Sequence, residues 1–149
     1  MSTSAAKHPL HLVYTSDENY LFLTKVSVCS AFMQASRPTD LIIHLLDCGI
    51  SDAMWDAWVK DLVERTGQRA FGRHRIDVNR FAGLREWKGT LATYARLCPP
   101  EALPNEAWCV YVDGDTLFTD DPFKLTDLFD STCAMQGFQI WHEVRPMES

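Results

Sequence analysis

Residues 109–118 read Cys-Val-Tyr-Val-Asp-Gly-Asp-Thr-Leu-Phe, a short apolar run that ends in two carboxylates, Asp113 and Asp115. Residues i and i+2 of an extended chain project to the same side, so a strand ending here holds two oxygen ligands at its tip. Such a pair suits Mg²⁺ or Mn²⁺, which keep positions open for substrate phosphates. Asp-Gly is equally a strong hairpin signal, so the pattern alone leaves both a metal site and a simple turn open.

The whole chain has 149 residues, 46% of them hydrophobic, which is enough for one globular domain with its own core. We expect a single domain over residues 1–149, with flexible tails at residues 1–9 and 142–149. The net charge is −6, and Lys and Arg are scattered along the chain. This charge pattern argues against a nucleic acid as the main partner.

The cysteines indicate a reducing compartment. There are five, an odd number, with apolar neighbours and no Cys-x-x-Cys spacing: Cys29, Cys48, Cys98, Cys109 and Cys133. They are typical of buried thiols rather than of a disulfide framework or a zinc site. The N-terminus is too polar for a secretory signal, and no apolar run is long enough to span a bilayer. We expect a cytoplasmic protein without a transmembrane segment.

Short apolar runs alternate with segments of helical periodicity. The runs predict strands at residues 10–14, 41–46, 74–78, 107–112 and 133–138. Helices are predicted after the capping residues 15–17, after Ser51 with an end before Gly67, over residues 90–97 with an end before Pro99, and after Asp121-Pro122. In the predicted helix after residues 15–17, the side chains at helical spacing are Phe22, Val26, Cys29 and Met33. The alternation predicts an α/β fold with a mostly parallel sheet and helices on both faces.

Ligands bind such sheets beyond the carboxyl ends of the strands, where Asp17, Asp47, Asp113 and Asp115 all fall. We expect Asp47 to shape a turn and leave it outside the site. The chain has neither a Gly-x-Gly-x-x-Gly fingerprint nor a Gly-Lys-Ser/Thr phosphate loop, so phosphate binding would depend on a metal.

Four segments together resemble a known family: Thr15-Ser16-Asp17-Glu18-Asn19-Tyr20, His44-Leu45-Leu46-Asp47-Cys48-Gly49-Ile50-Ser51, Thr93-Tyr94-Ala95-Arg96-Leu97 and Tyr111-Val112-Asp113-Gly114-Asp115-Thr116-Leu117. In order and spacing the chain resembles the N-terminal half of family 8 glycosyltransferases, which are retaining enzymes with a GT-A fold. It looks most like their bacterial lipopolysaccharide α-galactosyltransferase branch. The resemblance implies the Rossmann-like nucleotide-binding half of that fold.

The resemblance also implies a role for each matching residue. Asp113-Gly114-Asp115 would be the Asp-x-Asp motif, whose carboxylates hold Mn²⁺ (or Mg²⁺) on the diphosphate of a UDP-sugar. Asp17 and Asn19 would contact the uracil and ribose, with Thr15 and Ser16 bordering the base. Arg96 would lie under the donor site as the catalytic-site cation. The implied reaction is transfer of a hexose to a saccharide acceptor, such as lipopolysaccharide or another glycan.

The family motif that contains a late His, together with a neighbouring Lys, has no counterpart in the chain. His142 is the only His after the carboxylate pair, and its surroundings do not match that motif. We therefore expect a C-terminally truncated fold with doubtful catalytic competence. Such a fold would leave apolar surface open, so a dimer or a partner chain carrying the missing half is expected.

Three other interpretations stay open. A haloacid-dehalogenase-like phosphatase also has Asp-x-Asp after a strand, but Leu117 stands where those enzymes need Thr or Val. A non-catalytic remnant or one half of a split transferase would share all the matching segments. A calcium loop is disfavoured because Phe118 stands where its sixth-position Gly should be.

Overall fold

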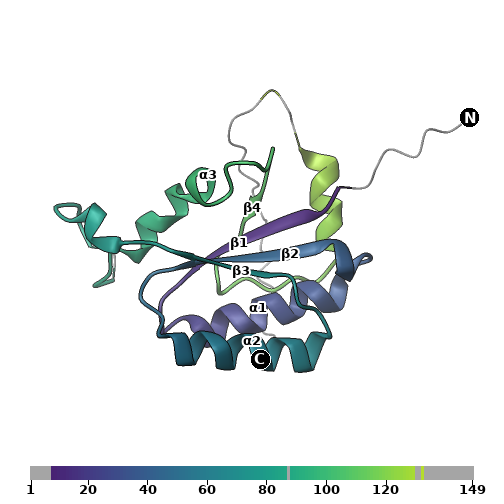
Figure 1. Ribbon diagram of the computed structural model, residues 1–149. Helices are drawn as coiled ribbons and strands as arrows, with labels where there is room; N and C mark the ends of the chain where they lie inside the picture. Colours follow the sequence, from purple (N-terminus) through teal and green to yellow (C-terminus); the bar gives the residue numbers. More distant parts are fainter. Residues whose placement is uncertain (1–7, 87, 130–131, 133–149) are drawn as a thin grey trace, which may run out of the picture.

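The computed structural model describes residues 8–86, 88–129 and 132 (Figure 1). Its centre is a parallel sheet of β1 (Leu10–Ser16), β2 (Leu41–Asp47), β3 (Phe71–Arg75) and β4 (Val110–Tyr111). Among the described residues the strand order is β3-β2-β1-β4. The two inner strands are almost wholly buried, as their continuous apolar runs predict. The expected parallel α/β architecture is confirmed.

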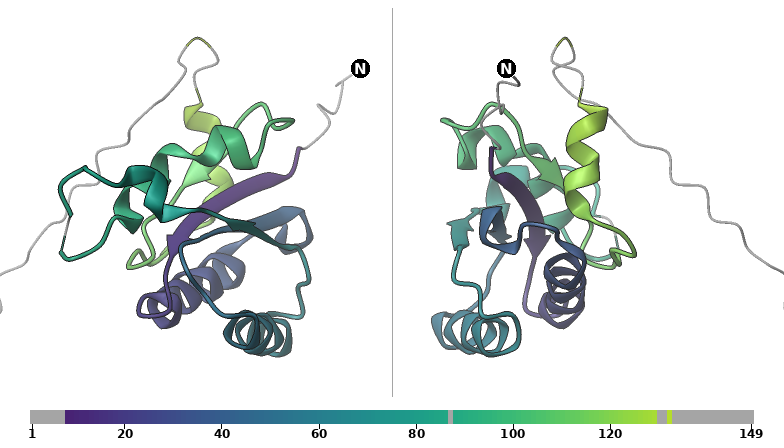
Figure 2. Two further views of the ribbon diagram at one scale, coloured as in Figure 1. Left: turned by 60° about the vertical axis from the view of Figure 1, so that its left-hand side comes forward. Right: turned by 90° about the vertical axis from the view of Figure 1, so that its right-hand side faces the viewer.

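Helices cover both faces of the sheet. The two long helices, α1 (Leu21–Gln34) and α2 (Asp52–Thr66), lie side by side on one face (Figures 1 and 2). The other face carries α3 (Pro99–Ala102) and the preceding 3₁₀ helix η3 (Ala92–Leu97). Helix α2 starts after Ser51 and ends at Gly67, whose φ of +69° closes it in the left-handed conformation, as predicted.

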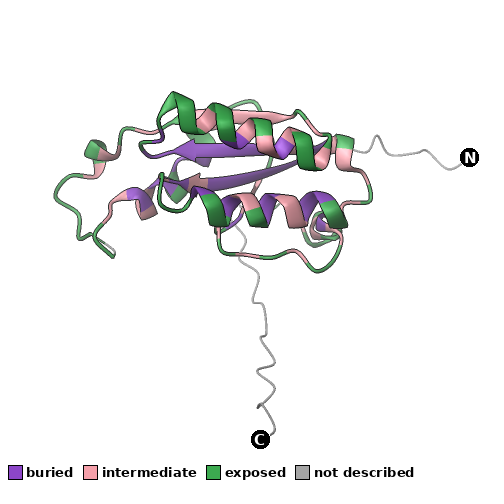
Figure 3. Ribbon diagram, turned by 90° about the horizontal axis from the view of Figure 1, so that it is seen from below, coloured by how far each residue is buried: buried purple, intermediate pink, exposed green. Residues whose placement is uncertain are grey.

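The main core lies between the sheet and the two long helices. Figure 3 looks onto α1 and α2, with the buried strands behind them. The buried Trp58 of α2 donates its indole N–H to the carbonyl of Leu21 at 3.0 Å, which ties the two helices together. Buried apolar residues of this core include Leu12, Tyr14, Val28, Phe32, Ile43, Leu45 and Leu62.

Two predicted strands differ from the observed ones. β3 spans Phe71–Arg75 rather than residues 74–78, because Asp77 bends the chain into the 3₁₀ helix η2 (Val78–Phe81) by accepting from the backbone N–H of Asn79 at 3.0 Å. β4 is shorter than the predicted residues 107–112. Its pairing with β1 continues one residue further, where Val112 N donates to Val13 O at 2.8 Å.

Two predicted helices are also altered. The helix expected over residues 90–97 is the 3₁₀ helix η3, and Pro99 opens α3 instead of only ending what precedes it. Proline suits a first helical position because the N–H that it lacks would be unpaired there anyway. Asp121 caps the next segment as predicted, accepting from Phe123 N at 3.1 Å, but that segment is also 3₁₀, η4 (Pro122–Leu128).

The connections produce one reversal in the sheet. Starting at β1, the chain adds β2 and then β3 on one side, and then returns to place β4 on the other side of β1.

The predicted strand at residues 133–138 and the tail at residues 142–149 lie outside the described residues. Within the described part, no helix combines the length and apolar character needed to cross a membrane.

Candidate functional site: the β1–β4 switch point

The reversal between β1 and β4 is where an open parallel sheet forms a crevice for ligands at its carboxyl edge. Leu12 and Val13 of β1 pair with Val110 and Tyr111 of β4. Asp17 directly follows β1, and Asp113 lies two residues beyond β4. The sheet register therefore brings segments nearly one hundred residues apart in sequence to the same edge.

Asp113 and Asp115 lie in a turn closed by a hydrogen bond from Thr116 N to Asp113 O at 3.0 Å. Both carboxylates are exposed, and no hydrogen bond or ion pair within the described structure engages Asp115. Gly114 is not among the glycines with positive φ, and β4 runs parallel to its neighbour, so the Asp-Gly hairpin interpretation is wrong.

Gly114 is needed for a different reason. A Cβ at this position would lie 2.6 Å from Oγ1 of Thr24 in α1. Thr24 is fully buried, and its hydroxyl donates to the carbonyl of Tyr20 at 3.1 Å. The turn that carries both carboxylates therefore rests directly on the start of α1.

The two carboxylates suit a divalent cation that retains water and substrate ligands. Their oxygens are hard donors of the kind that Mg²⁺ and Mn²⁺ prefer. No group of three or more His, Cys, Asp or Glu side chains within the described residues could hold a metal ion. Within the described residues the pair would supply two protein ligands, and phosphates and water could occupy further positions.

Arg96, on η3, lies beside this turn. Its Nη2 is 3.7 Å from Oδ1 of Asp113, and both side chains are about half exposed. The guanidinium also donates to the backbone carbonyl of Thr93 at 2.9 Å and to the Thr93 hydroxyl at 3.1 Å, which fixes its direction. The structure therefore places a cation next to the first carboxylate of the pair.

Tyr111 also lies at the candidate site, beside Arg96, and was not among the residues predicted there from the sequence. Its ring centroid lies 5.7 Å from the Arg96 guanidinium carbon. Burial raises the pKa of Tyr111, and the charge of the nearby Asp113 carboxylate raises it further. The two-residue spacing from Asp113 could have revealed it, because the two side chains project to the same side of a strand.

The four residues predicted at the end of β1 are close to the same edge. Ser16 is buried and donates to the carbonyl of Asp17 at 2.9 Å, whereas Asn19 is exposed. Oδ1 of Asp17 accepts from Tyr20 N at 3.1 Å, so this carboxylate also supports the start of α1. Oγ1 of Thr15 is buried without a hydrogen-bond partner within the described structure, despite its proximity to Tyr111.

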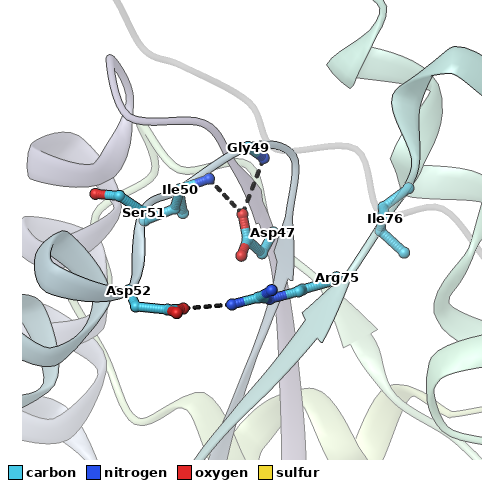
Figure 4. A pocket seen from close by; sticks show the side chains of 7 residues that line it. All are labelled: Asp47, Gly49, Ile50, Ser51, Asp52, Arg75 and Ile76. Carbon is cyan, nitrogen blue, oxygen red and sulfur yellow. Dashed lines mark hydrogen bonds and ion pairs between the residues drawn. The ribbon is translucent and has the colours of Figure 1, made fainter.

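Asp47 has the structural role that the sequence predicted. Its Oδ1 accepts from the backbone N–H groups of Gly49 and Ile50 at 2.9 and 2.6 Å, and its Oδ2 pairs with Arg73 Nε at 2.8 Å. Beside it lies a shallow, open hollow of about 350 Å³ at the ends of β2 and β3, which Asp52 and Arg75 also border (Figure 4). Because those two side chains pair with each other, the hollow offers no free charge.

The sheet order, the helices on its two faces and the carboxylates at its switch point define the class: the chain has a family 8-like glycosyltransferase fold. It is similar to the galactosyltransferase LgtC, solved in complex with donor and acceptor sugar analogs. That match has 28% identity, covers 79% of this chain and has a TM-score of 0.69. An active-site mutant of LgtC matches with 30% identity over 81% of this chain and a TM-score of 0.67.

A more distant match shares the fold alone. The bifunctional glycosyltransferase WbbM has 21% identity over 85% of this chain, with a TM-score of 0.63. The chain covers 42% of the LgtC chains and 22% of the WbbM chain, so it spans less than half of these neighbours. No family model and no curated protein sequence matches it.

Proposed function

We propose that this protein binds a UDP-sugar through a divalent cation, Mn²⁺ or Mg²⁺, held by Asp113 and Asp115. The observation that carries the proposal is the position of these two exposed carboxylates at the switch point, beside the end of β1, in a glycosyltransferase fold. LgtC, which shares this fold, was solved with donor and acceptor sugar analogs. A donor site in this chain agrees with that likeness.

We assign roles to the remaining site residues from their positions. Asp17, Asn19, Thr15 and Ser16 would contact the nucleoside, and the unpaired Oγ1 of Thr15 is a buried polar atom that a ligand could satisfy. Arg96 lies beside Asp113 and would add positive charge next to the diphosphate. Gly114 keeps the turn seated on α1.

The proposed reaction is hexosyl transfer with retention of configuration. The bond between the anomeric carbon and the β-phosphate oxygen would break, and UDP would leave with the electron pair. An acceptor hydroxyl oxygen would form the new bond on the same face of the sugar, and its proton would pass to the departing diphosphate. A bound divalent cation supplies stabilisation of the negative charge on the departing diphosphate. The acceptor we propose is a saccharide such as lipopolysaccharide or another glycan.

The four described cysteines are free thiols, and we propose the cytoplasm as the compartment.

Calorimetric titration of the protein with UDP, with and without Mn²⁺, tests the donor site. We expect binding that requires the metal and that falls at least tenfold in Asp113→Ala and in Asp115→Ala. Asp120→Ala is the matched control, because Asp120 is an exposed carboxylate five residues after Asp115 that pairs with Lys124. Absence of UDP binding in excess Mn²⁺ would overturn the proposal.

Product analysis separates donor binding from turnover. A transferase forms a glycoside when UDP-hexose and a saccharide acceptor are both present. Binding without product would favour a non-catalytic remnant or one half of a split transferase. Hydrolysis of a generic phosphate ester that is lost in Asp113→Ala would instead favour the phosphatase interpretation.

A further inference from the structure

Three histidines form a row across the sheet on the face opposite α1 and α2. His11 lies on β1, His44 on β2 and His74 on β3, each at an alternate position whose side chain points away from the main core. His11 and His44 are 7% and 8% exposed, and His74 is half-buried. Charging a buried histidine costs free energy, so the protonation states of three adjacent histidines on this face have to be explained.

The three rings and one carboxylate are joined end to end. His11 Nδ1 lies 2.9 Å from His44 Nε2, and His44 Nδ1 lies 3.0 Å from His74 Nε2. At the other end, His11 Nε2 lies 3.1 Å from Oε2 of Glu106, in the segment between α3 and β4. Each pair of neighbouring rings has its centroids 5.2 Å apart.

The carboxylate gives this row a direction. A carboxylate only accepts hydrogen bonds, and a neutral imidazole has one donor and one acceptor nitrogen. His11 must therefore carry its proton on Nε2 to donate to Glu106, which leaves Nδ1 to accept from Nε2–H of His44. His44 in turn accepts on Nδ1 from Nε2–H of His74. All three contacts are satisfied when every ring is neutral and has the same tautomer.

Protons are poorly accommodated in this arrangement. A charged ring donates from both nitrogens, so an extra proton on His11 or His44 forces the rings on its His74 side to change tautomer. A second proton on an adjacent ring would place two cations about 3 Å apart at their nearest nitrogens. Burial, followed by the charges of His11 and His74, lowers the pKa of His44 to about 4, and burial also lowers the pKa of His74.

The other titratable groups on this face do little to stabilise a positive charge on the histidine row. Glu106 is the acid in contact with the row, and it touches only its His11 end. The ion pair of Arg80 with Glu101 neutralises the charges nearest to α3. The titratable side chains packed on this face have pKa values raised by burial and are neutral: Cys98, Cys109 and Tyr111.

We propose that the Glu106–His11–His44–His74 row is a pH-sensitive latch, which in its neutral, ordered form ties three strands to the segment leading into β4 and which opens when protons accumulate on it. Histidines of the unfolded chain titrate near 6.5. The folded state therefore keeps its full stability above that pH and loses stability as the pH falls toward 4. Because the latched segment precedes Asp113, mild acid would loosen the strand that carries the proposed metal pair.

Thermal unfolding followed by circular dichroism between pH 4 and 8 tests the latch. For the natural protein we expect the folding equilibrium constant to fall on the order of a hundredfold between pH 6.5 and 4 through His44 alone. His44→Gln should lose much of this dependence, while the matched control His8→Gln, at an exposed histidine outside the row, should keep it. Identical pH profiles for the natural protein and a folded His44→Gln variant would overturn the proposal.

Nitrogen-15 NMR of the natural protein provides a second test that needs no variant. We expect three histidines as Nε2–H tautomers at pH 7, with at least one still neutral at pH 5. Three rings titrating independently near pH 6.5 would overturn the proposal.

Gly72→Ala tests the geometry of the row while leaving every titratable group in place. The new Cβ would lie 2.9 Å from His44 Nδ1 and 3.3 Å from His74 Nε2, the two atoms of one hydrogen bond. We expect His74 to lose its fixed tautomer, whereas His11 keeps it. An unchanged His74 spectrum would contradict the proposed order.

Discussion

At the scale of single residues, the position of the proposed metal pair depends on a missing side chain. Gly114 leaves room for Thr24, which lies where a Cβ would be. The Asp-Gly-Asp sequence was compatible with a turn and with a metal site, and these residues do form a turn. Close contact with α1, rather than a left-handed backbone, is what requires the glycine.

Gly114→Ala should therefore disturb the site without changing its charge. We expect a loss of about 1–3 kcal/mol in the free energy of unfolding, the usual cost of overpacking, together with weaker Mn²⁺-dependent UDP binding. Denaturant unfolding and calorimetry measure the two effects.

Thr24 provides the control for this prediction. Thr24→Ala removes the Oγ1 that the new methyl group would strike, so the double variant should regain part of the loss. Thr24→Ser keeps that oxygen and should not rescue. A Gly114→Ala protein as stable as the natural one would show that α1 does not constrain the turn.

At this scale, a sequence pattern can predict which residues follow a strand but not which residues they contact. Asp113, Asp115 and Asp17 were predicted at one edge because each follows an apolar run, and the topology places them there. Thr24 had no such signal, since its role depends on which face of α1 meets the turn. Tertiary contacts of this kind are invisible to local periodicity.

At the scale of elements, helix α1 shows why periodicity can select the wrong face. Phe22, Val26, Cys29 and Met33 have the helical spacing that predicted this helix, but Phe22 and Met33 are 66% and 83% exposed. The helix instead buries Leu21, Thr24, Ser27, Val28, Ala31 and Phe32. Small and hydroxyl side chains on that face let the helix approach the sheet, where the buried Tyr14 hydroxyl lies 3.1 Å from Ser27 Oγ.

The turn after β2 depends on one buried carboxylate. Asp47 is 3% exposed and has partners for both of its oxygens. Asp47→Asn would turn its amide N–H group either toward the backbone N–H donors, which would then lose their acceptor, or toward Arg73, which would lose its buried carboxylate partner. We expect the free energy of unfolding to fall by roughly 3 kcal/mol, measured by denaturant titration.

Asp52→Asn is the matched control for Asp47→Asn. Asp52 binds the same Arg73 but from the exposed side, and the arginine hydrogen bonds lower the pKa of its carboxyl. Since exposed ion pairs contribute little, this variant should unfold almost as the natural protein does. Equal losses in the two variants would show that burial of Asp47 is not what matters.

At the scale of the whole molecule, the strand–helix alternation predicted the parallel sheet and its ligand-binding edge. The order of the strands was beyond the sequence, because apolar runs of similar length do not specify their neighbours. Placement of β4 beside β1 creates the switch point, and this could only be seen in the structure. The histidine row was missed for the same reason, since its members are thirty or more residues apart.

The exposed face of α1 predicts association in solution. Phe22, Leu23, Val26 and Met33 are all at least 40% exposed along one helix. Several large apolar side chains exposed along one helix favour contact with another molecule. Sedimentation velocity over a range of concentrations should show concentration-dependent association, which Phe22→Ser and Met33→Ser together reduce. Leu97→Ser, at an exposed leucine on η3, should leave it unchanged, and a monodisperse monomer at every concentration would contradict the prediction.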